Sequence, residues 1–239
     1  MRGPFTFARR QTAARERGVV SLEFAAIAPV LLLMVIGAFD IARAIAVWQQ
    51  TLTAAQWAAI SANFLSIQTD SSTSLTPAQA TMAMTTIYGA MPQIQQGLYN
   101  GPYSVTLSGV YFTPASGQNT AKVIWSVPLL TGTGNLQNVR RTCGVVQQVT
   151  AMPQNSTNMQ YVPTQSITYP TTVLVADVHY QFTPMFFNFI TGPIDFWETY
   201  AFPPPIGANS QSVCYDLANP NDANLCPGYV AALCQPAAT

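Results

Sequence analysis

Residues 15–38 read RERGVVSLEFAAIAPVLLLMVIGA, and the rest of the chain is organised around this stretch. The run from Val19 to Ala38 contains twenty residues. As an α-helix it would be about 30 Å long, close to the thickness of the hydrocarbon core of a bilayer. Arginines precede the run, which is typical of the cytoplasmic flank of a membrane segment. The stretch therefore predicts a transmembrane helix.

Two residues inside this run need an explanation. An unpaired carboxylate near hydrocarbon costs about 2.5–3.5 kcal/mol, so we expect a cation to pair with Glu23. Pro29 removes a backbone donor and would kink or loosen the helix locally. A cleavable secretory signal fits less well, because the apolar run is long, contains an acid and lacks a convincing small-residue cleavage site before a polar domain.

Charge is scarce and unevenly distributed. Charged residues make up 8% of the 239 residues, against about 25% in typical soluble domains. Five of the nine basic residues lie before Gly18, and the remainder carries four basic and eight acidic residues. The chain beyond residue 18 is therefore mildly acidic and has no basic patch for nucleic acid. Low charge with abundant Thr, Tyr, Val and Pro favours an exported, β-rich protein.

Helix-forming sequence continues beyond Ala38 without Pro or Gly. Apolar residues recur there at three- to four-residue spacing, so the outer half has an apolar stripe. These features predict one long helix from about Val19 to about Ile67. Asp40 and Arg43 lie three residues apart and should pair on its surface, which is a small effect.

The sequence pattern changes after this helix. Thr76 and Pro77 are typical of a helix start, and Gly89 should end the second helix. Alternating apolar and polar residues then predict three strands and a fourth weaker one, over 103–112, 122–127, 171–182 and 145–150. They would form a small antiparallel sheet against one of the helices.

Two regions are expected to be mostly irregular. Residues 128–170 are rich in Gly, Asn, Gln, Thr and Pro, which favours loops. Residues 184–205 contain clustered aromatics and predict an apolar loop. This loop would cover the sheet, lie on the membrane surface or contact a partner, in that order of preference.

Together these features predict an α+β protein, in which a long N-terminal transmembrane and amphipathic helix precedes a small antiparallel-sheet domain with a disulfide-containing C-terminal tail. The domains would be a basic cytoplasmic leader at 1–18, a transmembrane and stalk helix at 19–67, a periplasmic α+β domain at 68–205 and a Cys-containing tail at 206–239.

The chain has four cysteines, all beyond the predicted membrane segment: Cys143, Cys214, Cys226 and Cys234. An oxidising compartment would allow two disulfides, with three connectivities, or one disulfide and two thiols. Zinc is not expected, because no two cysteines are two to four residues apart and the only histidine, His179, is distant. The absence of a Cys-x-x-Cys motif disfavours redox catalysis.

No motif for catalysis stands out. The sequence has no nucleophile elbow, phosphate-cradling glycine loop or paired-carboxylate signature. His179 lies in a predicted strand and is best interpreted as structural, and the Asp195 and Glu198 pair is a weak signal. We therefore expect neither an enzyme nor a cofactor.

The opening stretch resembles a known family. Gly18, followed by the apolar run with Glu23 five residues later and preceded by arginines, resembles the class III signal of type IV pilin-like proteins. More closely, RGVVSLEFAAIAPVLLLMVIGAFDIARA resembles the N-terminal motif of TadE-like proteins, the minor pseudopilins of the tight-adherence (Flp-type) pilus system. The resemblance covers residues 16–60, with a fainter similarity in VIWSVPL and VLVADVHYQFTPMFF.

The resemblance implies a structural, non-enzymatic pilus protein with a single membrane pass, a cytoplasmic N-terminus and a periplasmic domain. A prepilin peptidase would cut between Gly18 and Val19. Glu23 would then compensate the new ammonium of Val19 on the same or a neighbouring subunit. The implied partners are the inner membrane, the prepilin peptidase, other pilin-like subunits and the tight-adherence secretion machinery.

Two alternatives come from other functional classes. The first is a single-pass inner-membrane protein whose periplasmic domain binds a ligand or partner and is not built into a pilus. The second is a secreted hydrolase behind a cleaved signal, whose mature chain would begin after about Ala44.

Overall fold

The computed structural model describes residues 9–67, 74–92, 94, 103–115, 119–129, 140–152, 158–165, 170–186, 188–202, 213–216, 219 and 221–228. The chain divides into two compact units. The first, which we call the anchor unit, contains Met1–Ile45 and Pro184–Gly192. The second, the sheet unit, contains Ala46–Thr183 and Pro193–Thr239.

The helix α1 runs from Arg9 to Ile67 with Pro29 inside it. It ends where the sequence predicts and begins ten residues earlier than Val19. The segment Ser21–Ser66 is long and apolar enough to cross a membrane, and only 6% of its most apolar window is buried. The core helix of a soluble protein would be mostly buried, and this segment is therefore a candidate membrane span.

The part of α1 in the sheet unit has a different surface. Small residues at three- and four-residue spacing lie on one side of it and are fully buried: Ala54, Ala55, Ala58, Ala59 and Ala62. Side chains of this size let neighbouring backbones approach closely. The Trp57 ring lies against Gly89, where a Cβ atom would come within 2.9 Å of it.

Two short helices follow α1. The helix α2, Pro77–Thr85, begins with a capping box, in which Thr76 Oγ1 accepts a hydrogen bond from Gln79 N and Gln79 Oε1 accepts one from Thr76 N. This arrangement satisfies backbone donors that the first turn leaves without partners. The helix breaks at Thr86, and α3, Ile87–Ala90, continues through Gly89. Gly89 therefore does not end the helical region as predicted.

Six strands form the main sheet in the order β5-β4-β3-β2-β6-β7. The predicted strands are all present, as β2 Tyr103–Thr113, β3 Thr120–Pro128, β4 Gly144–Val149 and β6 Thr171–Phe182. The region predicted as mostly loop also contains β5, Tyr161–Pro163, which follows the short 3-10 helix η1, Asn158–Gln160. Neighbours pair antiparallel, except that β4 and β5 are parallel.

The prediction of a loop throughout 184–205 was wrong in its second half, because β7 spans Ile194–Phe202. Aromatic and acidic residues occur on both sides of this segment, so it lacks the clear alternation that predicts a strand. Its structure comes from pairing with β6 from Leu174↔Phe202 to Phe182↔Ile194. The first half contains a short helix, α5, Asn188–Thr191.

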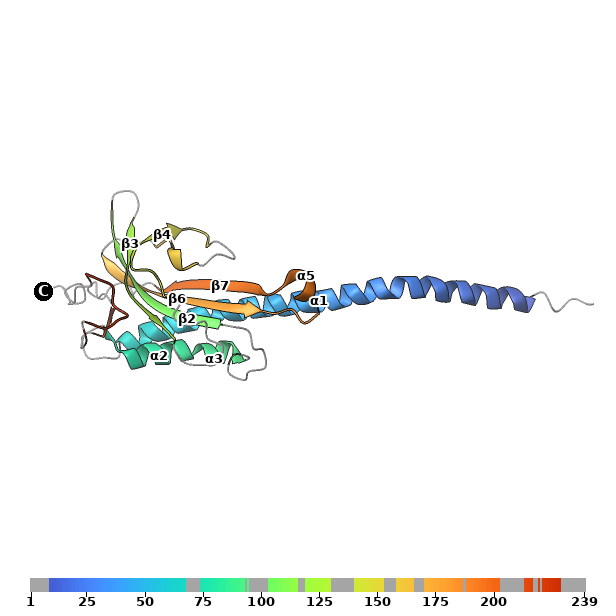
Figure 1. Ribbon diagram of the computed structural model, residues 1–239, viewed down its shortest axis with the longest axis horizontal. Helices are drawn as coiled ribbons and strands as arrows, with labels where there is room; N and C mark the ends of the chain where they lie inside the picture. The colour runs from blue at the N-terminus through green and yellow to red at the C-terminus, as the bar shows by residue number, and fades with distance from the viewer. Residues whose placement is uncertain are drawn as a thin grey trace, which may run out of the picture. The chain divides into compact units, whose positions relative to one another are not determined.

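The two faces of the sheet contact different partners. Figure 1 places α2, α3 and the C-terminal part of α1 along one face of the strands. On this helix face, the hydroxyls of Tyr88 and Tyr103 lie 3.5 Å apart, and Trp48 Nε1 of α1 donates a hydrogen bond to Glu198 of β7. The opposite face carries a hydrophobic cluster: Val110, Phe112, Ala121, Val123, Val146, Val162, Val173, Val175, Ala201 and Cys226.

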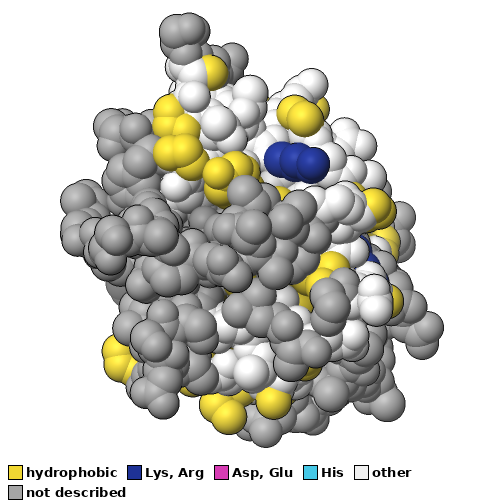
Figure 2. Space-filling model, turned by 90° about the vertical axis from the view of Figure 1, so that its left-hand side faces the viewer, with side chains coloured by type: hydrophobic (Ala, Val, Ile, Leu, Met, Phe, Trp, Pro, Cys, Tyr) yellow, Lys and Arg dark blue, Asp and Glu magenta, His cyan; other side chains and the backbone are white. Residues whose placement is uncertain are grey.

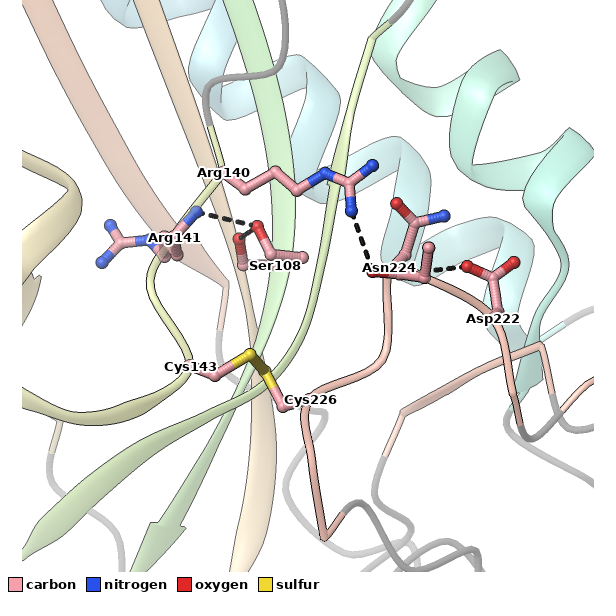
Figure 3. The surroundings of a disulfide bond; sticks show 9 residues. Ser108, Arg140, Arg141, Cys143, Asp222, Asn224 and Cys226 are labelled. Atoms are coloured by element: carbon pink, nitrogen blue, oxygen red, sulfur yellow. Dashed lines mark hydrogen bonds between the residues drawn. A yellow bond between two sulfur atoms is a disulfide. The ribbon is translucent and has the colours of Figure 1, made fainter.

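The edge of β3 is shared between β4 and the C-terminal tail. Residues 121–123 of β3 pair with β4, whereas Trp125 bridges to Leu225 of the tail. Ser126 N donates to Asn224 O, and Cys226 N donates to Ile124 O. The disulfide between Cys143 and Cys226 joins the two segments where they meet, next to Ile124 (Figure 3). A strand edge that would otherwise be open is therefore covered.

A second, smaller sheet also involves the tail. The strand β1, Ser74–Leu75, pairs in parallel with β8, Cys214–Tyr215. Tyr215 stacks on the fully buried Trp125, with ring centroids 5.4 Å apart. These described residues of the tail therefore pack against the rest of the sheet unit.

Gly109 provides a test of this packing. It lies opposite Trp125 at a register irregularity, and a Cβ atom there would lie 2.2 Å from Trp125 Nε1. Because Trp125 is held by Tyr215 and by a hydrogen bond to Val213 O, it cannot move aside without breaking contacts. We expect Gly109→Ala to lower the free energy of unfolding by about 1–3 kcal/mol.

The measurement is thermal or urea unfolding of the detergent-solubilised chain, followed by tryptophan fluorescence. Thr113→Ala, at the exposed end of β2, is the control and should change stability little. Equal stability of the Gly109→Ala variant and the wild type would contradict this description of the core.

Candidate functional site

The residues predicted to act in processing and assembly all lie in α1. The helix continues through Gly18 and Val19 without a break, and Glu23 is exposed on its surface. The part of the chain that the structure describes supplies no ion-pair partner for Glu23. The pairing of Glu23 with a cation stays a prediction.

Asp40 and Arg43, the first charged residues after Glu23, belong to a cluster that joins the two segments of the anchor unit. Asp40 is 5% exposed. Its Oδ1 accepts a hydrogen bond from Met185 N at 3.2 Å, and its Oδ2 accepts one from Phe186 N at 2.9 Å. Backbone hydrogen bonds to a carboxylate are stronger than those to a neutral acceptor. Asp40 therefore clamps the chain segment that leaves β6 onto α1.

Arg43 and two aromatic rings complete this cluster. Arg43 Nη1 lies 3.7 Å from Asp40 Oδ1, and its guanidinium lies 5.9 Å from the centroid of the Phe39 ring. The Phe39 and Phe186 rings meet edge to face at 6.4 Å. The predicted Asp40–Arg43 pair is thus present, but Asp40 is covered rather than on the helix surface. The three-residue spacing in the sequence predicts the ion pair. It does not predict that Met185 and Phe186 cover Asp40, because they are distant in sequence.

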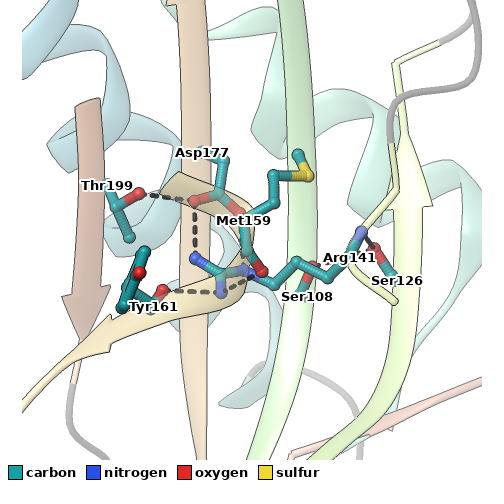
Figure 4. A network of polar contacts seen from close by, with 7 residues as sticks. All are labelled: Ser108, Ser126, Arg141, Met159, Tyr161, Asp177 and Thr199. Atoms are coloured by element: carbon teal, nitrogen blue, oxygen red, sulfur yellow. Dashed lines mark hydrogen bonds and ion pairs between the residues drawn. The ribbon is translucent and has the colours of Figure 1, made fainter. Parts of the chain in front are cut away.

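The strongest polar network lies in the sheet unit. Arg141 Nε and Nη2 donate to the two carboxylate oxygens of Asp177, each at 2.7 Å, and both side chains are buried. Arg141 Nη1 donates to the carbonyls of Met159 and Tyr161, and Thr199 Oγ1 donates to Asp177 at 2.6 Å. Figure 4 shows these groups converging from η1, β5, β6 and β7.

The same arginine is tied to the centre of the sheet through its backbone. Arg141 N donates to Ser126 Oγ at 3.0 Å, and the hydroxyls of Ser126 and Ser108 lie 2.9 Å apart. Two residues later, Cys143 forms the disulfide with Cys226. The segment that leads into β4 is therefore held at Arg141 by hydrogen bonds and at Cys143 by the disulfide. The donors and acceptors of the network bind one another. It is therefore structural, and sequence spacing did not indicate it.

His179 is buried beside a carboxylate. Its Nε2 lies 2.9 Å from Asp195 Oδ1, and its ring stacks on Trp197 at 3.9 Å. Burial lowers the pKa of His179, although Asp195 acts in the opposite direction. Burial also raises the pKa of Glu198, while the hydrogen bond from Trp48 opposes this shift. These contacts agree with the structural interpretation of His179.

The described residues do not form a metal centre. Among them, no three His, Cys, Asp or Glu side chains are grouped closely enough to hold a metal ion. In Figure 2, residues that the structure does not describe cover much of the face, and the coloured side chains between them are apolar groups with small areas of Lys or Arg.

The structure describes three of the four predicted disulfide cysteines. Cys143 bonds to Cys226, which are 83 residues apart in sequence, and Cys214 is also disulfide-bonded. Cys234 lies outside the described residues. The spacing of the cysteines in the sequence could not predict that Cys143 pairs with Cys226, because this pairing depends on the tail lying beside β3.

Comparison with known proteins returns one family. Residues 18–59 match the model of the family described as TadE-like protein. No curated protein and no solved structure matches the chain. The match begins at Gly18 and includes Glu23, Asp40 and Arg43, so it confirms the resemblance seen in the sequence for this segment.

The Asp40 clamp can be tested by hydrogen exchange. In Asp40→Ala, the amides of Met185 and Phe186 lose their acceptor, and a hydrogen bond to a charged group contributes about 1.5–3 kcal/mol. We expect both amides to exchange about ten to one hundred times faster, measured by mass spectrometry or NMR on the solubilised chain. Thr53→Ala, which removes an exposed side-chain hydrogen bond on the same helix, should leave them unchanged. Unaltered protection in Asp40→Ala would refute the clamp.

The Arg141–Asp177 pair can be tested by a double-mutant cycle. Arg141→Met or Asp177→Leu alone leaves a buried charge without its partner, and we expect each to cost about 3–5 kcal/mol of unfolding free energy. The double variant removes both charges and should cost clearly less than the sum of the two. Additive losses in chemical denaturation would show that the two groups do not act as a pair.

Proposed function

With a TadE-like segment at residues 18–59 as its N-terminal anchor, we propose that the protein is a structural minor pilin or pseudopilin of a tight-adherence pilus. It acts by helix packing and assembly rather than by catalysis, and supports surface attachment. The observation that carries this proposal is the match that begins at Gly18 and places Glu23 five residues later, at the head of an exposed apolar helix.

The two surfaces of α1 support an anchored rather than a free protein. The anchor unit exposes large apolar side chains from Leu22 to Val35, which would be unstable in water. The sheet unit buries the alanine stripe of the same helix. Both surfaces are explained if α1 is inserted in the inner membrane. The N-terminus is then cytoplasmic and the sheet unit periplasmic. An oxidising periplasm also suits the disulfides.

Processing and assembly are assigned to the first residues of the segment. The prepilin peptidase cuts between Gly18 and Val19, and the carboxylate of Glu23 then pairs with the new ammonium group of Val19 on the same or a neighbouring subunit. A buried acid with a cationic partner is far less costly than a lone one. Other pilin-like subunits and the tight-adherence secretion machinery are the remaining partners.

Intact-mass analysis tests the processing step. In cells with the peptidase, the wild-type chain should begin at Val19, and Gly18→Leu should accumulate as the full-length form because the bulky side chain blocks cleavage. Gly37→Leu, which makes the same substitution farther along α1, should be processed normally. A wild-type chain that begins at Met1 whether or not the peptidase is present would remove the processing proposal.

Filament fractionation separates the leading proposal from a ligand- or partner-binding membrane protein. A minor pilin should appear in sheared surface filaments, and its loss should reduce pilus assembly. Retention of the whole pool in the inner membrane, with normal filaments in its absence, would favour the binding protein instead.

A further inference from the structure

The anchor unit exposes apolar side chains at a defined position along α1. Phe39, Ile41 and Ile45 of the helix are exposed, and so are Met185 and Phe186 of the segment clamped by Asp40. Residues 184–192, PMFFNFITG, contain no charge. Each large apolar side chain left in water forgoes about 1.5–3 kcal/mol. A group of them on one unit indicates a surface that is covered in the working protein.

The position of this surface along the helix identifies what covers it. At 1.5 Å per residue, Asp40 lies about 30 Å along α1 from Val19, which is the thickness of the hydrocarbon core. Residues 24–39 carry no charge, and Asp40 and Arg43 are the next charged residues. A membrane segment that starts at Val19 therefore reaches the opposite headgroup region at Phe39 to Arg43.

We propose that Phe39, Ile41, Met185 and Phe186 form a membrane-surface collar that inserts into the outer leaflet of the inner membrane. The occupant of this surface is the lipid interface, and the collar is continuous with the exposed apolar face of the membrane segment. This inference rests on the proposed membrane anchor and goes beyond it, because it assigns a lipid contact to Met185 and Phe186, which are 145 and 146 residues from Asp40 in sequence.

The clamp explains how a polar backbone turn can lie at this depth. The amides of Met185 and Phe186 would be costly to bury in lipid without acceptors, and Asp40 supplies one oxygen to each. Arg43 partly neutralises the carboxylate, and its long side chain can extend its charge toward the headgroups. The side chains of the turn are then free to face the acyl chains.

Such a collar sets the depth and tilt of α1. A single helix can slide or tilt in a bilayer at a cost of only fractions of a kcal/mol per Å. Apolar side chains from a second segment, inserted about 5–10 Å into the interface, would resist both movements. The point at which α1 leaves the membrane would then be defined.

Three exposed methionines provide matched labelling positions. Met34 lies in the apolar run, Met185 in the collar and Met82 on α2, and they are 66%, 58% and 59% exposed. Each is replaced by cysteine in the full chain, labelled with the environment-sensitive fluorophore NBD, and reconstituted in phosphatidylcholine nanodiscs at one chain per disc. The described cysteines are disulfide-bonded and should not react with the fluorophore. Labelling of the unsubstituted chain measures the background.

Lipid-borne and aqueous quenchers then report depth. We expect Met34→Cys to be quenched by lipids with a deep doxyl group, Met185→Cys by lipids with a shallow one, and Met82→Cys by iodide alone. Iodide quenching at position 185 should be several-fold weaker than at position 82.

Two outcomes would overturn the collar, and a third concerns the anchor. If position 34 is deep and position 185 is as accessible to iodide as position 82, the collar is wrong and the anchor stands. If position 185 is shielded from iodide without quenching by any lipid, protein covers it and the collar is again wrong. If position 34 itself behaves like position 82, the membrane anchor fails, and with it the premise of the collar.

Discussion

One constraint shapes this protein, which is that a single helix must satisfy two environments. Through the anchor unit, α1 exposes Leu, Val, Ile and Phe side chains, which lipid would cover in the proposed membrane anchor. Through the sheet unit, it buries an alanine stripe against protein. The two requirements favour opposite side chains, because lipid contact rewards apolar area whereas close packing of backbones requires small residues.

The few charges beyond the N-terminal segment are used inside the protein as well as on its surface. Asp40 holds a distant backbone turn, and Arg141 with Asp177 connects four elements of the sheet unit. Each carboxylate has several donors, which offsets the cost of removing it from water. Several of the few charged residues therefore have structural roles in these networks.

Sequence patterns were informative where one periodicity applied along a whole element. The apolar run of α1, the helix start at Thr76 and Pro77 and the alternation in β2, β3 and β6 each predicted the element that is observed. The sequence patterns did not predict the strands that depend on pairing with a neighbouring strand. The strand β7 has no clear alternation and depends on β6, and β5 adds in parallel to β4 within a region that composition indicates as loop.

The sequence by itself determined the apolar helix, the TadE-like segment and the α+β composition, because all of these depend on residues that are neighbours along the chain. The tertiary structure alone decided that Cys143 pairs with Cys226, that Arg141 meets Asp177 and that Asp40 is covered by Met185 and Phe186. These partners are 83, 36 and about 145 residues apart. Such contacts depend on strand order and on where the tail lies, which no local periodicity encodes.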